Sequence, residues 1–230
     1  MRILLIRHAD PDYPNDTITA TGHLEAQALA QRLAKEGIDR IYSSPINRAV
    51  HTMQYTAELL GIEPVIEPWT RELSLNSYDY SGGKCAAWNI PGEIVRAVQP
   101  YPSHEIWPER DPFRDYAQTY EQLKVNSDDF FRRFGYERED GRYRILSSNR
   151  ETFAVFCHHG FGTTWLAHLL ELPLPLVWSG FWLPPSSVTT IVFEERSEDW
   201  AVPRCIGLGS ISHLHEAGLG FSTAGLFPNL

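Results

Sequence analysis

Short apolar runs alternate with amphipathic segments over the first third of the chain. Residues 3–6 are uninterruptedly apolar, which is typical of a strand buried on both faces of a sheet. A following set of apolar residues recurs at i, i+3, i+4 and i+7: Ala26, Leu29, Ala30 and Leu33. This spacing predicts a helix with one apolar face, and residues 40–43 then predict a second short strand.

A second helix and a third strand continue the alternation. Ser44 and Pro45 suit a helix cap and a first helical position. The buried stripe of this helix would be Val50, Met53, Ala57 and Leu60. Residues 64–67 predict the third strand, so the order strand, helix, strand, helix, strand indicates a doubly wound sheet.

The alternation breaks down between about residue 68 and residue 145, a segment that we call the insertion. It is rich in aromatic residues, prolines and charges, and it predicts only one clear helix, over residues 116–134. We expect the insertion to form a partly helical cap over the strand ends, although a small separate domain is an alternative.

Regular structure is expected to resume with an apolar strand over residues 152–157. A helix with Trp165 in its apolar face should follow, and then strands over 187–193 and 205–211. We therefore predict a single domain, residues 1–230, of the α/β class. It would be a three-layer α/β/α sandwich with a mostly parallel central sheet and the insertion as its cap.

Basic side chains occur where these strands end. Arg7 and His8 follow the first strand, Arg48 lies in the first turn of the second helix, and His158 follows the strand over 152–157. Ligands of open α/β sheets bind beyond the carboxyl ends of the strands, and helix N-termini favour anions. Each residue alone could be an ordinary turn or surface residue, but together they predict a phosphate site.

Two carboxylates of the insertion could overhang that site. Glu72 comes just after the third strand, and Asp79 is the next candidate. Either could supply a proton to a departing oxygen, and for either a solvated surface position is the alternative.

Composition narrows the class of partner. The net charge of −9, without runs of like charge, argues against nucleic acid or an anionic membrane surface as a partner. No apolar run is long enough to span a bilayer, and no signal peptide is evident. The three cysteines show no metal-ligand spacing, so we expect reduced thiols, a cytoplasmic location, and neither a metal nor a cofactor.

Four segments resemble the histidine phosphatase superfamily, the phosphoglycerate-mutase-like group. Arg7-His8-Ala9 is similar to the Arg-His-Gly signature of that family. The other three segments look like its Leu-Thr-x-x-Gly helix start, its Ser-x-x-x-Arg-Ala-x-x-Thr segment and the segment of its second histidine: residues 19–22, 43–52 and 156–160. Ala9 departs from the family glycine, and His159 beside His158 makes the second histidine ambiguous.

The resemblance implies a role for each residue. His8 would be the nucleophile that becomes phosphohistidine, and Glu72 would be the proton donor. The phosphoryl oxygens would be held by Arg7, Arg48 and His158. We choose His158 over His159 because the apolar residues of the following helix then fall where the family has them.

The expected function is therefore a metal-independent phosphatase that hydrolyses a small phosphomonoester through a phosphohistidine intermediate. Its partner would be a small phosphorylated metabolite. One alternative is a phosphoglycerate-type mutase, which must keep the intermediate from water. The other is a catalytically silent module that binds a phosphorylated ligand, and a Glu72 turned away from the site would favour it.

Overall fold

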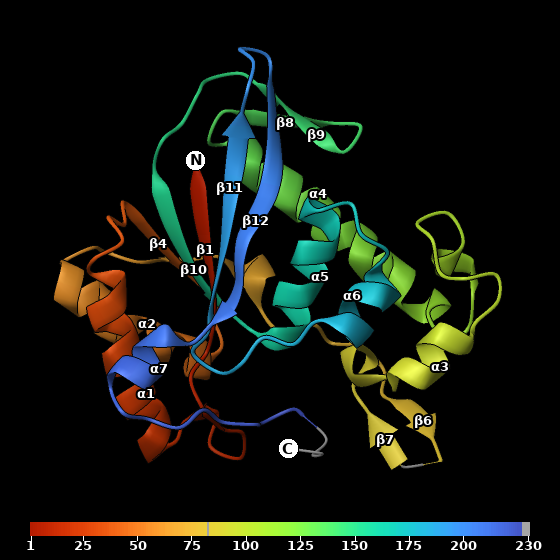
Figure 1. Ribbon diagram of the computed structural model, residues 1–230, viewed down its shortest axis with the longest axis horizontal. Coiled ribbons are helices and arrows are strands. Elements are labelled where there is room, and N and C mark those ends of the chain that lie inside the picture. Colours follow the sequence, from red (N-terminus) through yellow and green to blue (C-terminus); the bar gives the residue numbers. More distant parts are fainter. Residues whose placement is uncertain (82, 227–230) are drawn as a thin grey trace.

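The computed structural model describes residues 1–81 and 83–226, which are built around an eight-stranded sheet (Figure 1). In spatial order the strands are β5 (Val65–Ile66), β4 (Arg40–Ser43), β10 (Thr152–Cys157), β1 (Arg2–Arg7), β11 (Val188–Glu195), β12 (Trp200–Ser210), β9 (Arg142–Ile145) and β8 (Tyr136–Glu139). Strand β1, which carries Arg7 at its end, lies in the centre of this sheet between β10 and β11.

The sheet is mixed, so the predicted parallel arrangement is found in one half of the sheet and not in the other. Strands β5, β4, β10 and β1 run parallel, whereas every pairing from β1 to β8 is antiparallel. Short connections join β8 to β9 and β11 to β12, and they require these two pairs to be antiparallel. Asp140 and Gly141 both adopt positive φ in the turn between β8 and β9, and such a tight turn joins only antiparallel strands.

The central strands are buried on both faces, as their apolar runs predicted. In β1, Ile3 and Leu5 pack into one core cluster, together with Phe153 of β10. Leu4 and Ile6 point to the opposite face of the sheet, where they belong to a second core cluster. This alternation follows from the pleat of a strand, and it makes β1 the element that both layers of helices contact.

Helices cover the two faces of the sheet, which confirms the three-layer α/β architecture. One face carries α1 (Ala20–Leu33), α2 (Asn47–Leu60) and α7 (Ser212–Glu216) (Figure 1). The other carries α4 (Ala117–Arg132), α5 (His159–Leu169) and α6 (Leu174–Gly180). None of the helices in the described residues is long and apolar enough to cross a membrane.

The insertion contains α3 (Gly92–Ala97) and α4, with a small hairpin of β6 (Tyr78–Tyr80) and β7 (Gly83–Cys85). Its 3-10 turns are η1 (Pro68–Thr70), η2 (Ala87–Asn89), η3 (Trp107–Glu109) and η4 (Arg114–Tyr116). Trp107 and Phe113 are buried in a cluster of their own that also includes residues of α6. Strands β8 and β9 extend the central sheet, so this last part of the insertion does not lie over the strand ends.

One local expectation differs from the structure. Helix α2 begins at Asn47, so Ser44 and Pro45 precede it, and the Ser44 hydroxyl has another partner. After β12 the chain turns at Ile211 into α7, which carries His213 and His215.

The chain after β1 passes unusually close to the start of α1. It first forms a small ribbon of β2 (Pro11–Asp12) and β3 (Thr17–Ile18). Thr19 caps α1 by accepting a hydrogen bond from the Gly22 backbone N–H at 3.0 Å. A Cβ atom on Gly22 would stand 2.5 Å from the backbone oxygen of Asp10, so only glycine permits this approach.

We therefore expect Gly22→Ala to lower the free energy of unfolding by about 1–3 kcal/mol, the usual cost of overpacking. Gly207→Ala is the matched control, because a Cβ atom there meets nothing within 4 Å. Urea denaturation of both variants measures the difference. Equal midpoints for Gly22→Ala and Gly207→Ala would contradict this account of the turn.

Candidate active site

His8 lies directly after β1, with its side chain only 2% exposed. Its Nδ1 lies 2.8 Å from the backbone oxygen of Ala9. Since a carbonyl oxygen can only accept, the Nδ1 atom carries the proton and donates it to Ala9. The Nε2 atom then keeps its lone pair, which is the form of imidazole that can act as a nucleophile.

Position 9 holds alanine, where the family that the sequence resembles has glycine, and the structure has room for it. Ala9 is fully buried and does not adopt a positive φ. Its backbone N–H donates to the Thr52 hydroxyl of α2 at 2.9 Å. The turn after His8 is thus fixed by hydrogen bonds on both sides of Ala9, and a methyl group is accommodated there.

The parallel register of β1 and β10 pairs Arg7 with Cys157, and this places the next residues, His8 and His158, side by side. Their ring centroids are 5.3 Å apart. The Nε2 atom of His158 lies 2.7 Å from the Ser44 hydroxyl at the end of β4. Ser44 accepts from the Ile46 backbone N–H, so its own proton is available for His158.

This pairing allows the second imidazole to act as a donor. When Ser44 donates to Nε2 of His158, the Nδ1 atom carries the proton. That Nδ1 atom is buried and has no hydrogen-bond partner in the structure. In this tautomer, His158 presents an N–H group that a ligand beside His8 can use.

Two arginines complete the cluster. Arg7 is 2% exposed and donates to the backbone oxygens of Leu183, at 2.6 Å, and Ala224, at 3.0 Å. Arg48 donates to the Asp16 carboxylate at 3.1 Å. The Nε atoms of both arginines are buried and have no hydrogen-bond partner in the structure.

The arginine charges act on both imidazoles. Burial lowers the pKa of His8 well below its usual range, and the charge of Arg7 lowers it further. Burial likewise lowers the pKa of His158, with Arg48 and then Arg7 adding to the effect. Both rings are thus neutral near pH 7, because a third and a fourth positive charge in the same buried space would be unfavourable.

Glu72 follows η1 and lies at the N-terminus of α5. Its carboxylate accepts from the backbone N–H groups of Gly160, at 3.1 Å, Phe161, at 2.8 Å, and Leu73, at 3.1 Å. Burial raises the pKa of Glu72, although these three donors and the charge of Arg48 act in the opposite direction. A carboxyl group with a raised pKa, close to two arginines, has the character of a proton donor.

The remaining candidates lie elsewhere. Asp79 is on the β6–β7 hairpin, where its side chain is 72% exposed and 3.6 Å from Lys84. His159 accepts a hydrogen bond from the Leu183 backbone N–H at 3.3 Å, and it faces a cavity beside Trp88 and Trp182. The structure therefore brings together Arg7, His8, Arg48, His158 and Glu72, and it leaves Asp79 outside this cluster.

Sequence reasoning missed three contacts at the site. Ser44 was interpreted as a helix cap, although its position after β4, next to β10, could have indicated a partner for His158. A Cβ atom on Gly160 would stand 2.5 Å from the ring of Trp88, so α5 requires glycine there. The carbonyl of Ala224 reaches Arg7 from the far end of the chain, which no sequence pattern indicates.

A sequence profile of the histidine phosphatase superfamily (branch 1) matches residues 3–204. A putative phosphoserine phosphatase of Hydrogenobacter thermophilus is 32% identical over 87 residues, which cover 34% of this chain and 43% of the relative. A probable phosphoglycerate mutase of Serratia proteamaculans is 30% identical over 84 residues, which cover 33% of this chain and 39% of the relative. The matched part thus spans less than half of the length of these relatives.

Solved structures share the fold over nearly the whole chain. A phosphoserine phosphatase of Entamoeba histolytica, solved in complex with 3-phosphoglyceric acid, superposes with a TM-score of 0.62 at 21% identity and covers 93% of this chain and 98% of that one. A mycobacterial glucosyl-3-phosphoglycerate phosphatase gives a TM-score of 0.60 at 18% identity, covering 91% and 98%.

The buried His159 generates a prediction about stability. Burial lowers the pKa of His159 from 6.5 to about 3. Below pH 6.5 the unfolded chain therefore binds a proton at this position that the folded chain does not bind until about pH 3. Stability should fall as the pH falls through this window, by up to about 1.4 kcal/mol per pH unit from this group.

His159→Asn keeps a hydrogen-bond acceptor but removes the titration. We expect its free energy of unfolding to fall less steeply between pH 6.5 and pH 5 than that of the native protein. Denaturant unfolding at several pH values measures the two slopes. Parallel curves for the two proteins would show that His159 titrates normally in the folded state.

Proposed function

This chain belongs to the histidine phosphatase superfamily, and on that premise we propose that it is a phosphatase that hydrolyses small phosphomonoesters through a phosphohistidine on His8. The reaction would need no metal, because the charge of the phosphoryl group would be balanced by side chains of the chain itself. A small phosphorylated metabolite would be the substrate.

One observation carries the proposal. The Nε atoms of Arg7 and Arg48 and the Nδ1 atom of His158 are buried donors without partners in the structure. All three residues lie within electrostatic range of one another and of His8. Buried donors are normally satisfied, so a shared acceptor with several oxygens and negative charge, such as a phosphoryl group, fits this arrangement.

The chemistry would proceed in two displacements. Nε2 of His8 attacks phosphorus and forms the N–P bond, while the bond to the ester oxygen breaks. Protonated Glu72 gives its proton to that oxygen, and the alcohol leaves. Ionised Glu72 then takes a proton from water as the water attacks phosphorus, which releases inorganic phosphate and restores His8.

The position of Glu72 favours an enzyme over a silent binding module. The charges of Arg7 and Arg48 both act on this carboxylate, which supports a place for it beside the two arginines. We further propose that the part of the insertion before β8 caps the site and that the enzyme acts in the cytoplasm, which suits its three free cysteines, Cys85, Cys157 and Cys205. A mutase would instead return the phosphoryl group to a bound phosphoglycerate.

His8→Ala removes the proposed nucleophile. We expect hydrolysis of p-nitrophenyl phosphate to fall by at least about 10³-fold, because the variant lacks the imidazole whose lone pair would attack phosphorus. Circular dichroism verifies folding, and the exposed His104→Gln serves as the matched control. Substantial activity in folded His8→Ala would refute the assignment.

Glu72→Gln tests the proton donor. An alkyl phosphate leaves as a strongly basic alkoxide unless it is protonated, whereas nitrophenolate leaves without help. General acid catalysis typically contributes about 10²–10⁴-fold, so turnover of alkyl phosphates should suffer far more than turnover of p-nitrophenyl phosphate. Equal losses for both substrates would instead indicate that Glu72 only caps α5.

A further inference from the structure

Glu25 is a wholly buried carboxyl group that the proposed chemistry does not use. It lies on α1 with an exposed fraction of 0%, one turn after Gly22, where the helix passes close to Asp10. Its Oε2 atom accepts a hydrogen bond from the Asp10 backbone N–H at 2.8 Å, and its Oε1 atom is buried without a hydrogen-bond partner in the structure. A carboxyl group so poorly solvated is costly to bury, and this one contacts the residue two positions after His8.

The turn that carries His8 is held by groups from three other parts of the chain. The backbone oxygen of His8 accepts from the Ser186 backbone N–H at 3.0 Å. The Ala9 N–H donates to a hydroxyl of α2, and the Asp10 N–H donates to Glu25. Only the last of these three contacts uses an acceptor that can ionise. Hydrogen bonds to an ionised acceptor are roughly twice as strong as neutral ones, so this contact depends on the protonation of Glu25.

Ser186 links Glu25 to the same turn by a second route. Its φ of 56° lies in the left-handed region, which is uncommon for a residue other than glycine. Its hydroxyl is 3.1 Å from Nε2 of His213, and its side chain is close enough to Glu25 to act on the pKa of that carboxyl. Glu25, Ser186 and His213 are all buried, so they form one polar cluster against the backbone of the turn.

The charges around this cluster come from three elements. Burial raises the pKa of Glu25 from 4.5 to about 7; the Asp10 carboxylate acts in the same direction, and the charge of Arg7 in the opposite one. On α7, burial and the charge of Arg32 lower the pKa of His213 to about 4. As the pH rises through about 7, Glu25 therefore becomes ionised while His213 stays neutral.

We propose that Glu25 is a positioning residue for His8. Its ionised carboxylate holds the Asp10 N–H more firmly than its neutral form, and so fixes the turn in the geometry from which the imidazole attacks phosphorus. Glu25 acts through the backbone of the turn and not by contact with the substrate. This inference rests on the proposed phosphatase function, because it assigns a task to a residue outside the phosphate cluster.

Glu25→Gln keeps an acceptor for the Asp10 N–H but cannot ionise. Release of nitrophenolate in a single turnover, with enzyme in excess over p-nitrophenyl phosphate, reports the attack by His8 alone. The two proteins should react at equal rates at about pH 5.5, where Glu25 is neutral, and the native protein should be faster by about 3–10-fold at about pH 8.5. The ratio of the two rates cancels the ionisation of the substrate.

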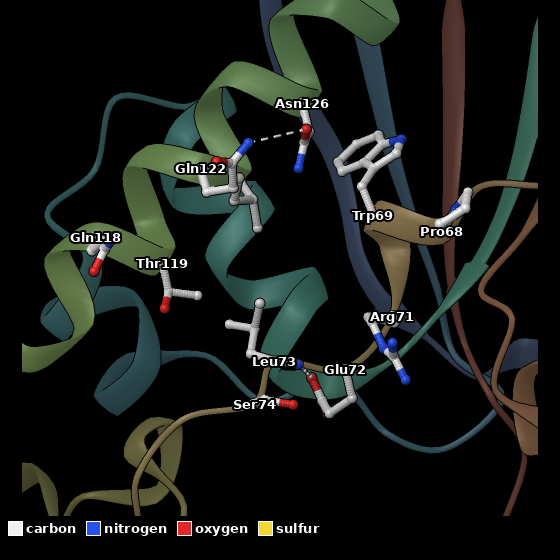
Figure 2. Close-up of a pocket in the computed structure, with 11 residues that line it drawn as sticks. Pro68, Trp69, Arg71, Glu72, Leu73, Ser74, Gln118, Thr119, Gln122 and Asn126 are labelled. Carbon is white, nitrogen blue, oxygen red and sulfur yellow. Dashed lines mark hydrogen bonds between the residues drawn. The ribbon is translucent and has the colours of Figure 1, made fainter.

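The ratio also separates Glu25 from Glu72, the other carboxyl group near the site with a raised pKa. Glu72 lines an open cavity of about 420 Å³ between the segment after η1 and α4, whereas Glu25 lies inside the domain (Figure 2). Both proteins keep Glu72, and nitrophenolate leaves without a proton from it. A pH-dependent ratio therefore reports Glu25.

Two further variants serve as controls. Glu58→Gln removes a negative charge from an exposed position of α2, and it should keep the native rates at both pH values. Glu25→Asp keeps the charge but shortens the side chain, so the contact with Asp10 is lost and the rate at about pH 8.5 should fall by about 3–10-fold. Circular dichroism verifies folding, and Glu25→Asp decides the question if Glu25→Gln does not fold.

The outcomes distinguish this inference from the function on which it rests. If the reaction requires His8 but the ratio of native to Glu25→Gln rates does not change with pH, the positioning role is refuted and the phosphatase stands. Native rates in Glu25→Asp, a native protein slower than Glu25→Gln at about pH 8.5, or failure of both variants to fold also refute it. If nitrophenolate release does not require His8, the proposed function itself is refuted.

Discussion

The burial of positive charge at the end of β1 is the constraint on which the site depends. Arg7 is almost wholly inaccessible, and burial is strong enough to lower the pKa even of this guanidinium. Removing a charge from water costs several kcal/mol unless partners replace the lost solvation. Carbonyl dipoles of Leu183 and Ala224 supply part of that replacement, and neither carries a full charge.

The same burial determines the chemistry of the histidines. With two arginines nearby, a protonated imidazole at position 8 or 158 would add to an already unfavourable concentration of charge. Backbone and hydroxyl partners then favour the same Nδ1–H tautomer in the two rings, but they leave a different nitrogen of each ring open. His8 offers a lone pair because Ala9 takes its proton, and His158 offers an N–H because Ser44 occupies its other nitrogen. A phosphoryl group would use both and would add the missing negative charge.

The parts of the fold that could be predicted were those specified locally. The apolar run of β1 and the i, i+3, i+4 pattern of α1 each require burial of a particular face, so their positions followed from the residues alone. The direction of β11 beside β1 and of β9 beside β12 did not, because these pairings join strands far apart in the chain, whereas the Asp140-Gly141 hairpin between β8 and β9 was a local signal that the sequence analysis did not use. The placement of β8 and β9 at the sheet edge is likewise a long-range pairing.

The active site likewise has residues that could be predicted from the sequence and contacts that could not. Arg7, His8, Arg48 and His158 were expected together because each follows a strand or opens a helix at one edge of the sheet. The hydrogen bond from Arg7 to Ala224 and the bond between Ser44 and His158 join residues more than a hundred positions apart, and only the folded chain reveals them. The role of Glu72 stays a proposal, since capping α5 would require the same three backbone contacts.

Identification of the phosphorylated side chain tests the central claim most directly. The enzyme would be quenched in alkali during turnover of a phosphomonoester and digested, and the peptide that carries phosphate would be sequenced by mass spectrometry. The account predicts acid-labile, alkali-stable phosphate on Nε2 of His8, and none on His158. Phosphate on another residue, or turnover at a measurable rate with no phosphoenzyme formed, would contradict it.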